Sequence, residues 1–196
     1  MKFFYIIFAL LLSFTLLLSS FELTFFLFHS PFDSTIVEPK AHSLTWIYLL
    51  EQKYITFIDL DIFTIHEKRH LLDVKRLFEN IHSVWITVSV ISLSLVIFLY
   101  FRAKERLILV FRYSFFIGLM VVALSILLAF DFLNSFKFLH QLLFLEHSWI
   151  FPDDSILIEW FPLSYFQEFV VIVISIFFMF LLFLKSLHSL DKNRID

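Results

Sequence analysis

The sequence has no cysteine and a single glycine, Gly118, among its 196 residues. The absence of cysteine excludes disulfide bonds, thiolate zinc ligands and a cysteine nucleophile. One glycine is too few for a glycine-rich phosphate loop or for the G-x-S-x-G turn of serine hydrolases. An enzyme of this composition that acted on acyl groups would depend mainly on histidine for acid–base catalysis.

Charged residues make up only 17% of the chain, and the formal net charge is -3. This balance gives no electrostatic footprint for nucleic acid, so nucleic acid is excluded as a partner. Hydrophobic residues, in contrast, make up 60% of the chain, and 30 residues are Phe. Soluble globular domains contain about 45–50% apolar residues, so the composition predicts a membrane protein.

Four runs approach or exceed the length of about 20 apolar residues that crosses a bilayer. The first run exceeds the roughly 7–15 apolar residues of a signal peptide, so we expect it to be a retained span. Residues 1–196 are therefore predicted to form a single integral membrane domain. The predicted spans are 3–28, 84–101, 107–130 and 169–184.

The positions of lysine and arginine predict the orientation of these spans. Arg102, Lys104 and Arg106 lie in the short connection between the second and third spans. By the positive-inside rule this connection and both termini are cytoplasmic, so segments 29–83 and 131–168 face outward. The other basic residues that support this orientation are Lys2, Lys185, Lys192 and Arg194.

The first outward segment contains patterns of regular structure. Residues 45–52 are typical of a short amphipathic helix, and residues 53–64 are β-branched and aromatic, as in a strand. Thr64 lies three residues before Glu67, the spacing of a helix capping box. The helix that begins there is expected to continue past Asn80 into the second span.

The second outward segment, 131–168, mixes large apolar residues with prolines and acids, and no part of it suits a transmembrane helix. It is expected to be interfacial or re-entrant, with Trp149, Trp160 and Tyr165 at headgroup depth. The predicted fold class is therefore an all-α membrane protein. Its four transmembrane helices carry a small extracytoplasmic cap of short helices and strand or re-entrant segments.

The letters "HEKRH" at residues 66–70 match the H-E-x-x-H motif of zinc proteases. On a helix, His66, His70 and Asp73 share one face. A catalytic zinc needs a third protein ligand, which would have to be His140 or a more distant acid. A membrane zinc metalloprotease thus stays open at this point. A non-catalytic assembly factor or lipid-binding membrane protein also stays open.

The remaining histidines differ in position. His140 follows the third span and is placed to face His70, whereas His147 is a weaker candidate. His188 belongs to the predicted cytoplasmic tail. The other histidines are interpreted as structural or headgroup-facing residues: His29, His42 and His82.

Two stretches resemble a bacterial family of four-span membrane proteins, the lipoprotein intramolecular transacylases. "DIFTIHEKRHLLDVKRLF" (61–78) resembles the family signature F-T-x-x-E-x-x-H-x-x-D-V-K, in which the position of His66 is variable. "FKFLHQLLFLEHSWIFPDDSILIEWFP" (136–162) is similar to a second signature, in which a His precedes aromatic residues, a Trp, an Asp and a closing Phe-Pro. One aromatic residue of that signature is replaced next to Phe144, and its glycine near the Trp is absent.

No metal or other cofactor is indicated by the sequence, and the resemblance implies an enzyme. Its substrate would be a diacylated lipoprotein in the bacterial cytoplasmic membrane, where the enzyme also contacts membrane lipids. The implied reaction moves the sn-2 acyl chain of the diacylglyceryl-cysteine to the α-amino group and gives a lyso-form lipoprotein.

The same resemblance implies roles for individual residues. We expect His70 and His140 to transfer the protons, with Glu67 or Asp73 orienting the base. The residues expected to contact the substrate are Phe144, Trp149 and Asp154.

Overall fold

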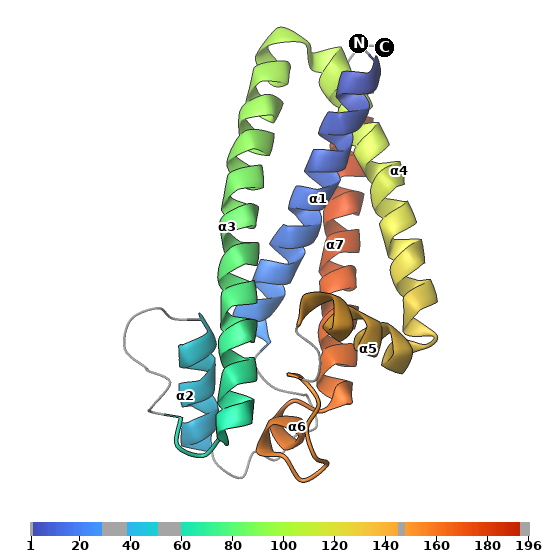
Figure 1. The fold of residues 1–196 in the computed structure, drawn as a ribbon. Helices are drawn as coiled ribbons and strands as arrows, with labels where there is room; N and C mark the ends of the chain where they lie inside the picture. The colour runs from blue at the N-terminus through green and yellow to red at the C-terminus, as the bar shows by residue number, and fades with distance from the viewer. Residues whose placement is uncertain (1, 29–38, 51–59, 145–147, 193–196) are drawn as a thin grey trace. The chain divides into compact units, whose positions relative to one another are not determined.

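The computed structural model describes residues 2–28, 39–50, 60–144 and 148–192, and within these ranges the regular structure is entirely helical. Four helices are long and apolar enough to cross a membrane, which confirms the predicted four-span integral membrane fold. In chain order (Figure 1) the helices are α1 (Lys2–Leu27), α2 (Pro39–Leu50), α3 (Ile65–Arg102), α4 (Lys104–Ala129), α5 (Phe132–Leu143), α6 (Ile156–Trp160) and α7 (Leu163–Lys192).

The chain divides into two compact units. The first unit comprises Met1–Phe26, Ser83–Leu128 and Val170–Asp196. The second unit comprises Leu27–His82 and Ala129–Phe169, and it contains every residue that the sequence predicts for the active site.

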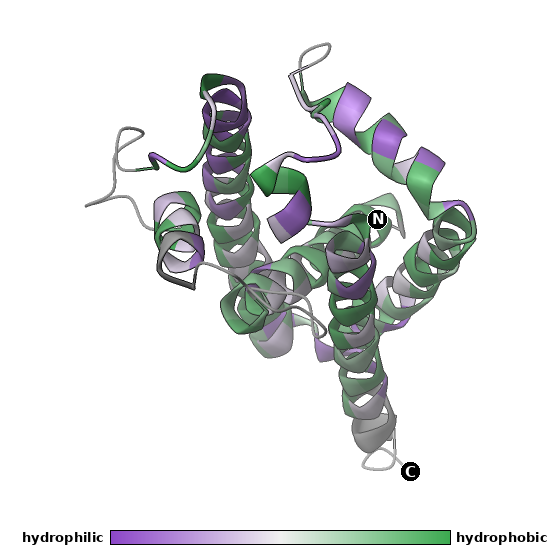
Figure 2. Cartoon of the chain, turned by 90° about the horizontal axis from the view of Figure 1, so that it is seen from below, coloured by the Kyte–Doolittle hydropathy of each residue, from purple (hydrophilic) through white to green (hydrophobic). Residues whose placement is uncertain are grey.

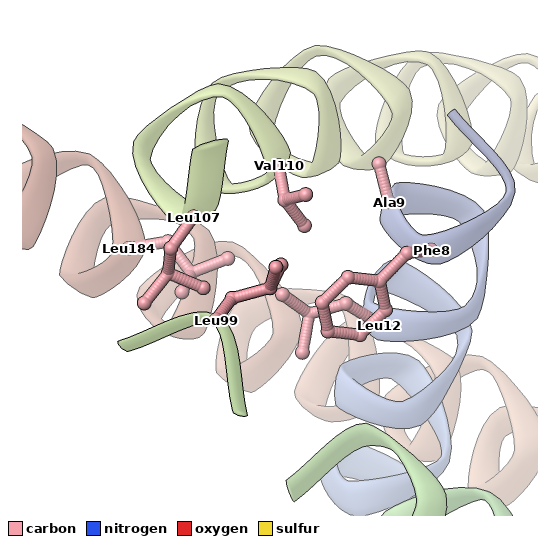
Figure 3. Packing of buried hydrophobic residues seen from close by; sticks show 7 residues of the cluster. All are labelled: Phe8, Ala9, Leu12, Leu99, Leu107, Val110 and Leu184. Carbon is pink, nitrogen blue, oxygen red and sulfur yellow. The ribbon is translucent and has the colours of Figure 1, made fainter. Parts of the chain in front are cut away.

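The core of the first unit joins residues of α1, α3, α4 and α7. Hydroxyl groups add hydrogen bonds between the helices: Ser13 Oγ donates to the Ser114 carbonyl (2.9 Å), and Ser114 Oγ donates to the Ala9 carbonyl (3.1 Å). Small and hydroxyl-bearing residues suit membrane helices, since lipid supplies little hydrophobic drive for helix association. The buried apolar cluster (Figure 3) consists of Phe8, Ala9, Leu12, Leu99, Leu107, Val110 and Leu184.

Gly118, the single glycine, is buried on α4 against Leu181 of α7. A Cβ atom at this position would lie 2.6 Å from Leu181 Cδ1 and 3.0 Å from Cγ. The missing side chain therefore leaves room for Leu181 of α7 to pack directly against α4.

Helix α3 is far longer than a membrane span. Its 38 residues extend for about 57 Å at 1.5 Å per residue, whereas the hydrocarbon core of a bilayer is about 30 Å thick. The charged residues between Ile65 and Arg102 are concentrated in the first half of the helix. The helix is thus long enough for the predicted span 84–101 and a charged extension before it, and the expected continuation of the helix past Asn80 is confirmed.

The second unit contains a helix where the sequence predicts one at 45–52, since α2 reaches Leu50. The strand predicted at 53–64 is wrong for its described part, residues 60–64, which forms a turn in which the Phe63 N–H donates to the Leu60 carbonyl (3.2 Å). Leu60 and Phe63 are both buried, a three-residue spacing that an alternating strand cannot provide. Residues 53–59 lie outside the described residues.

Aromatic rings form much of the core of the second unit. Trp160 contacts His42 (ring centroids 5.5 Å apart) and Phe63 (5.4 Å), while Tyr165 stacks on Phe28 (5.3 Å). Trp160, Tyr165 and His42 are all buried. Their rings therefore pack against protein, and His42, interpreted from the sequence as structural or headgroup-facing, lies within this core.

Candidate active site

The first turn of α3 is fixed by a capping box between Thr64 and Glu67. Glu67 Oε2 accepts hydrogen bonds from the Thr64 backbone N–H and from Thr64 Oγ1, both at 2.8 Å. In return, the Glu67 N–H donates to Thr64 Oγ1 at 3.3 Å. The predicted capping box is thus confirmed, and it fixes the position of His70 one turn further along α3.

The other oxygen of Glu67 binds a segment distant in sequence. Glu67 Oε1 accepts a 2.5 Å hydrogen bond from Ser155 Oγ and a 3.3 Å bond from the Leu157 N–H. Burial raises the pKa of this carboxyl, which is 3% exposed, but the hydrogen bonds from Ser155, Thr64 and Leu157 outweigh it, so the pKa lies below its ordinary value. Glu67 is therefore an ionised, fully engaged acceptor at neutral pH.

His70 is 7% exposed and lies among aromatic rings. Its ring centroid is 4.8 Å from that of Phe144, 5.4 Å from that of Phe151 and 6.2 Å from that of His140. Burial, together with the charges of His140 and His66, lowers the pKa of His70 to about 4. Its Nδ1 atom is buried without a hydrogen-bond partner among the described residues. His70 is therefore a neutral imidazole at pH 7.

His140 lies on α5, and the structure places it against His70, as predicted. Its Nδ1 is 3.0 Å from the carbonyl oxygen of Phe136, one helical turn earlier. A carbonyl oxygen can only accept, so Nδ1 carries the proton and Nε2 of the neutral ring holds the free lone pair. Burial lowers the pKa of His140 below its ordinary value, although the Phe136 hydrogen bond opposes the shift.

Aromatic rings surround the two histidines. Of the predicted substrate-contacting residues, Phe144 lies against both histidines and Trp149 lies 5.2 Å from His140 between ring centroids. Three further rings that the sequence did not single out also contact the pair: Phe136, Phe151 and Phe166. Phe136 precedes His140 by four residues, a helical spacing that would have revealed it.

The two other acids predicted for the site lie elsewhere in the second unit. Asp73 is partly exposed and pairs with Arg76 on the same helix, with 4.0 Å between carboxylate oxygen and guanidinium nitrogen. Asp154 is exposed. Orientation of the base by Asp73 and substrate contact by Asp154 stay predictions.

His66, the first residue of the H-E-x-x-H match, is exposed. Its Nε2 lies 3.4 Å from the Ile150 carbonyl oxygen, and its ring lies against Phe151 at 5.0 Å. In the part of the chain that the structure describes, no three His, Asp or Glu side chains come together as metal ligands. Glu67, which the motif would use to activate water, is instead bound to Thr64 and Ser155.

Residues 39–166 match the protein family described as lipoprotein intramolecular transacylase Lit. The chain belongs to this family. It is therefore an integral membrane enzyme, a transacylase that acts on lipoproteins, and this replaces the metalloprotease and the non-catalytic protein as interpretations of the sequence.

Solved structures of a Lit protein have the same fold. The Bacillus cereus membrane-integral Lit is 19% identical, with a TM-score of 0.79 over 100% of both chains. Its histidine-to-arginine variant is 18% identical, with a TM-score of 0.74 over 99% of this chain and 95% of that one. A histidine-to-alanine variant is also 18% identical, with a TM-score of 0.74 over 100% and 97%. Comparison with curated proteins gave no match.

Proposed function

We propose that this Lit-family enzyme moves the sn-2 acyl chain of a diacylglyceryl-cysteine lipoprotein to the α-amino group of the same cysteine, using His70 and His140 for proton transfer. The observation that carries the proposal is the pair itself. Two histidines from α3 and α5 lie 6.2 Å apart between ring centroids, within an aromatic surround. Both have pKa values lowered by burial, so both are neutral at pH 7.

The reaction needs one proton acceptor and one proton donor. The α-ammonium group loses a proton to a histidine, and the amine nitrogen then attacks the sn-2 ester carbonyl carbon. The C–O bond to the glyceryl oxygen breaks, and this oxygen takes a proton from the second histidine. As the amide forms, the nitrogen loses its second proton to the second histidine, which has just given its own proton to the glyceryl oxygen. One proton in total passes to water, and both histidines return to their starting form.

The hydrogen bond to Phe136 supports His140 as the base. Because its Nδ1–H is occupied by the Phe136 carbonyl, Nε2 is the nitrogen that can accept the ammonium proton. His70, with a pKa of about 4, is a weak base and suits the second role, in which a neutral imidazole N–H donates to the leaving oxygen. A neutral histidine is known to donate a hydrogen bond to a substrate carbonyl oxygen in triosephosphate isomerase.

Positioning supplies much of the remaining catalysis. Nucleophile and ester belong to one substrate molecule, and well-oriented intramolecular reactions reach effective molarities of about 10⁵–10⁸ M. The rings of Phe144 and Trp149 present apolar faces next to the histidines, where the glyceryl group and the first carbons of the acyl chain would lie.

Mass spectrometry of lipoprotein N-termini tests the proposal. Purified enzyme in detergent or vesicles, supplied with a diacylated lipoprotein, should yield an isomer of equal mass whose N-terminus is acylated and whose glyceryl group has a free hydroxyl. His70→Ala and His140→Ala should each abolish this product while the protein still inserts into membranes. Full activity in both variants would refute the histidine mechanism, and an unchanged lipoprotein would refute the reaction.

The proposed location is the bacterial cytoplasmic membrane, with both termini cytoplasmic and the second unit facing outward among lipid headgroups. The basic residues Arg102, Lys104 and Arg106 support this orientation through the positive-inside rule. Because the chain has no cysteine, Asp153→Cys and Lys104→Cys each provide one reactive thiol. A membrane-impermeant maleimide applied to intact cells should label the first variant and spare the second.

A further inference from the structure

We infer that Glu67 is a positioning residue of the active site, because its single carboxylate caps two helices and thereby holds the aromatic segment 148–157 against His70. The inference rests on the proposed function. It replaces orientation of the base, the role expected of Glu67 from the sequence, with a role that acts through Ser155 and Leu157, the partners of Glu67 Oε1.

The first cap is the ordinary one, within α3. Oε2 of Glu67 accepts from the N–H and the hydroxyl of Thr64, as a capping box requires. A glutamine would satisfy this arrangement as well as a glutamate. The capping box alone therefore does not explain a buried, ionised carboxylate at this position.

The second cap is on another helix. Ser155 is the N-cap residue of α6, yet its side chain makes no capping hydrogen bond. Its hydroxyl instead donates to Glu67 Oε1, and the same oxygen accepts the N–H of Leu157, the second residue of α6. Glu67 therefore satisfies an N–H group that an N-cap side chain normally satisfies, and its negative charge is favourable at a helix N-terminus.

This link determines where the aromatic ring of Phe151 lies. The Ser155 N–H donates to the Pro152 carbonyl at 3.0 Å, and the Ser155 carbonyl accepts from the Glu159 N–H at 3.0 Å. Holding Ser155 therefore holds both the turn that follows Phe151 and the first turn of α6. Phe151 in turn covers His70, with 5.4 Å between ring centroids. Glu67 and His70 are one turn apart on α3. The carboxylate therefore sets the distance between the His70 ring and the Phe151 ring that packs against it.

Ser155→Ala and Glu67→Gln test the link in different ways. Ser155→Ala removes only the hydroxyl bond, whereas Glu67→Gln keeps one side-chain oxygen, which can cap α3 or α6 but not both. Loss of one hydrogen bond to a charged group typically changes an equilibrium constant by about tenfold or more. Because this bond holds segment 148–157 in its catalytic arrangement, kcat/KM should fall by about that factor in each variant. Ser155→Thr retains the hydroxyl and should therefore keep the activity of the parent enzyme. Glu159→Gln, which changes an exposed carboxylate on α6, should behave as the parent.

A distance measurement separates positioning from a general loss of stability. The cysteine-free chain accepts spin labels at Arg69→Cys and Asp153→Cys, two exposed positions on α3 and on the segment before Ser155. Electron paramagnetic resonance should give one narrow distance distribution in the parent and in Ser155→Thr, and a broad one in Ser155→Ala and Glu67→Gln. The pKa of His70 should also rise toward its ordinary value in the two impaired variants, as measured by NMR titration, because Phe151 no longer shields the His70 ring from water.

Unchanged distances in both impaired variants would overturn the inference, whether or not activity falls, since no positioning would then have been lost. Parental activity in both would overturn it equally. Absence of lipoprotein acylation by the parent enzyme would instead refute the proposed function, and the distance measurement would still decide whether Glu67 holds the segment.

Discussion

His70 and His140 lie 6.2 Å apart between ring centroids, with their ring planes 28° from parallel. Two imidazoles this close disfavour double protonation, and burial acts in the same direction on both. The pair therefore enters the reaction uncharged. This property makes its pH dependence a direct test of the mechanism.

The first prediction concerns the pH–rate profile. The base must be neutral, and the pKa of His140 lies below its ordinary value of 6.5. We therefore expect kcat/KM to fall with decreasing pH only below about pH 6.5, and to be level from there to pH 8. Initial rates of N-acylation between pH 4.5 and 8, at constant ionic strength, measure the profile. An acid limb centred well above pH 6.5 would contradict a buried neutral base.

The second prediction concerns Phe144, whose ring lies against both histidines. Phe144→Ala should admit water, so the pKa of His70 should rise from about 4 toward 6.5. Looser positioning of the substrate should lower kcat by about tenfold to a hundredfold. Histidine-selective isotope labelling and NMR titration give the pKa. Phe144→Leu, which keeps the site apolar, is the matched control and should shift the pKa much less.

The third prediction concerns metal dependence. His66 is exposed, with its Nε2 atom 3.4 Å from the Ile150 carbonyl oxygen and its ring against Phe151. His66→Ala should therefore retain near-parental transacylase activity, and treatment with a chelator should leave the activity unchanged. Metal analysis of the purified enzyme completes the experiment. Stoichiometric zinc that disappears in His66→Ala, together with the activity, would revive the H-E-x-x-H interpretation.

The fourth prediction concerns Gly118. In a free helix, alanine is more favourable than glycine by about 1 kcal/mol. Here the added methyl group would overlap Leu181, so Gly118→Ala should destabilise the protein by about 1–3 kcal/mol.

Thermal unfolding in detergent measures this effect. Combined with Leu181→Ala, which makes room for the methyl group, Gly118→Ala should cost less than the sum of the two single changes. Leu182→Ala, at an exposed neighbouring position, should give no such coupling. Additive losses in the Leu181 double variant would mean that α4 and α7 are not in close contact at Gly118.

The features predicted correctly from the sequence depend on local or periodic patterns. The apolar runs predict the spans because length and composition suffice for that purpose. Thr64 and Glu67 predict the helix start because the capping box is a three-residue pattern. The strand expected at 53–64 shows the limit of this approach. β-branched and aromatic residues favour strands, yet in the described part Leu60 and Phe63 are buried by a turn.

The features that were missed depend on long-range contacts. Ser155 binds Glu67 across 88 residues, and no local pattern relates a serine before a short helix to a glutamate on another one. The positions of Phe151 and Phe166 beside the histidines could not be predicted for a different reason. With 30 Phe residues in the chain, aromatic character does not distinguish a ring beside the histidines from one in a span.

The bond between His140 and the Phe136 carbonyl has a wider consequence. The donor and the acceptor lie on the same turn of α5, so the tautomer of His140 depends on that turn being wound. If the turn unwinds, Nδ1 of His140 loses the Phe136 carbonyl as its acceptor, and the imidazole no longer favours the tautomer protonated at Nδ1. The backbone conformation of the five residues 136–140 therefore determines the basicity available at Nε2, and the stability of α5 sets the fraction of enzyme molecules in which His140 can act as the base.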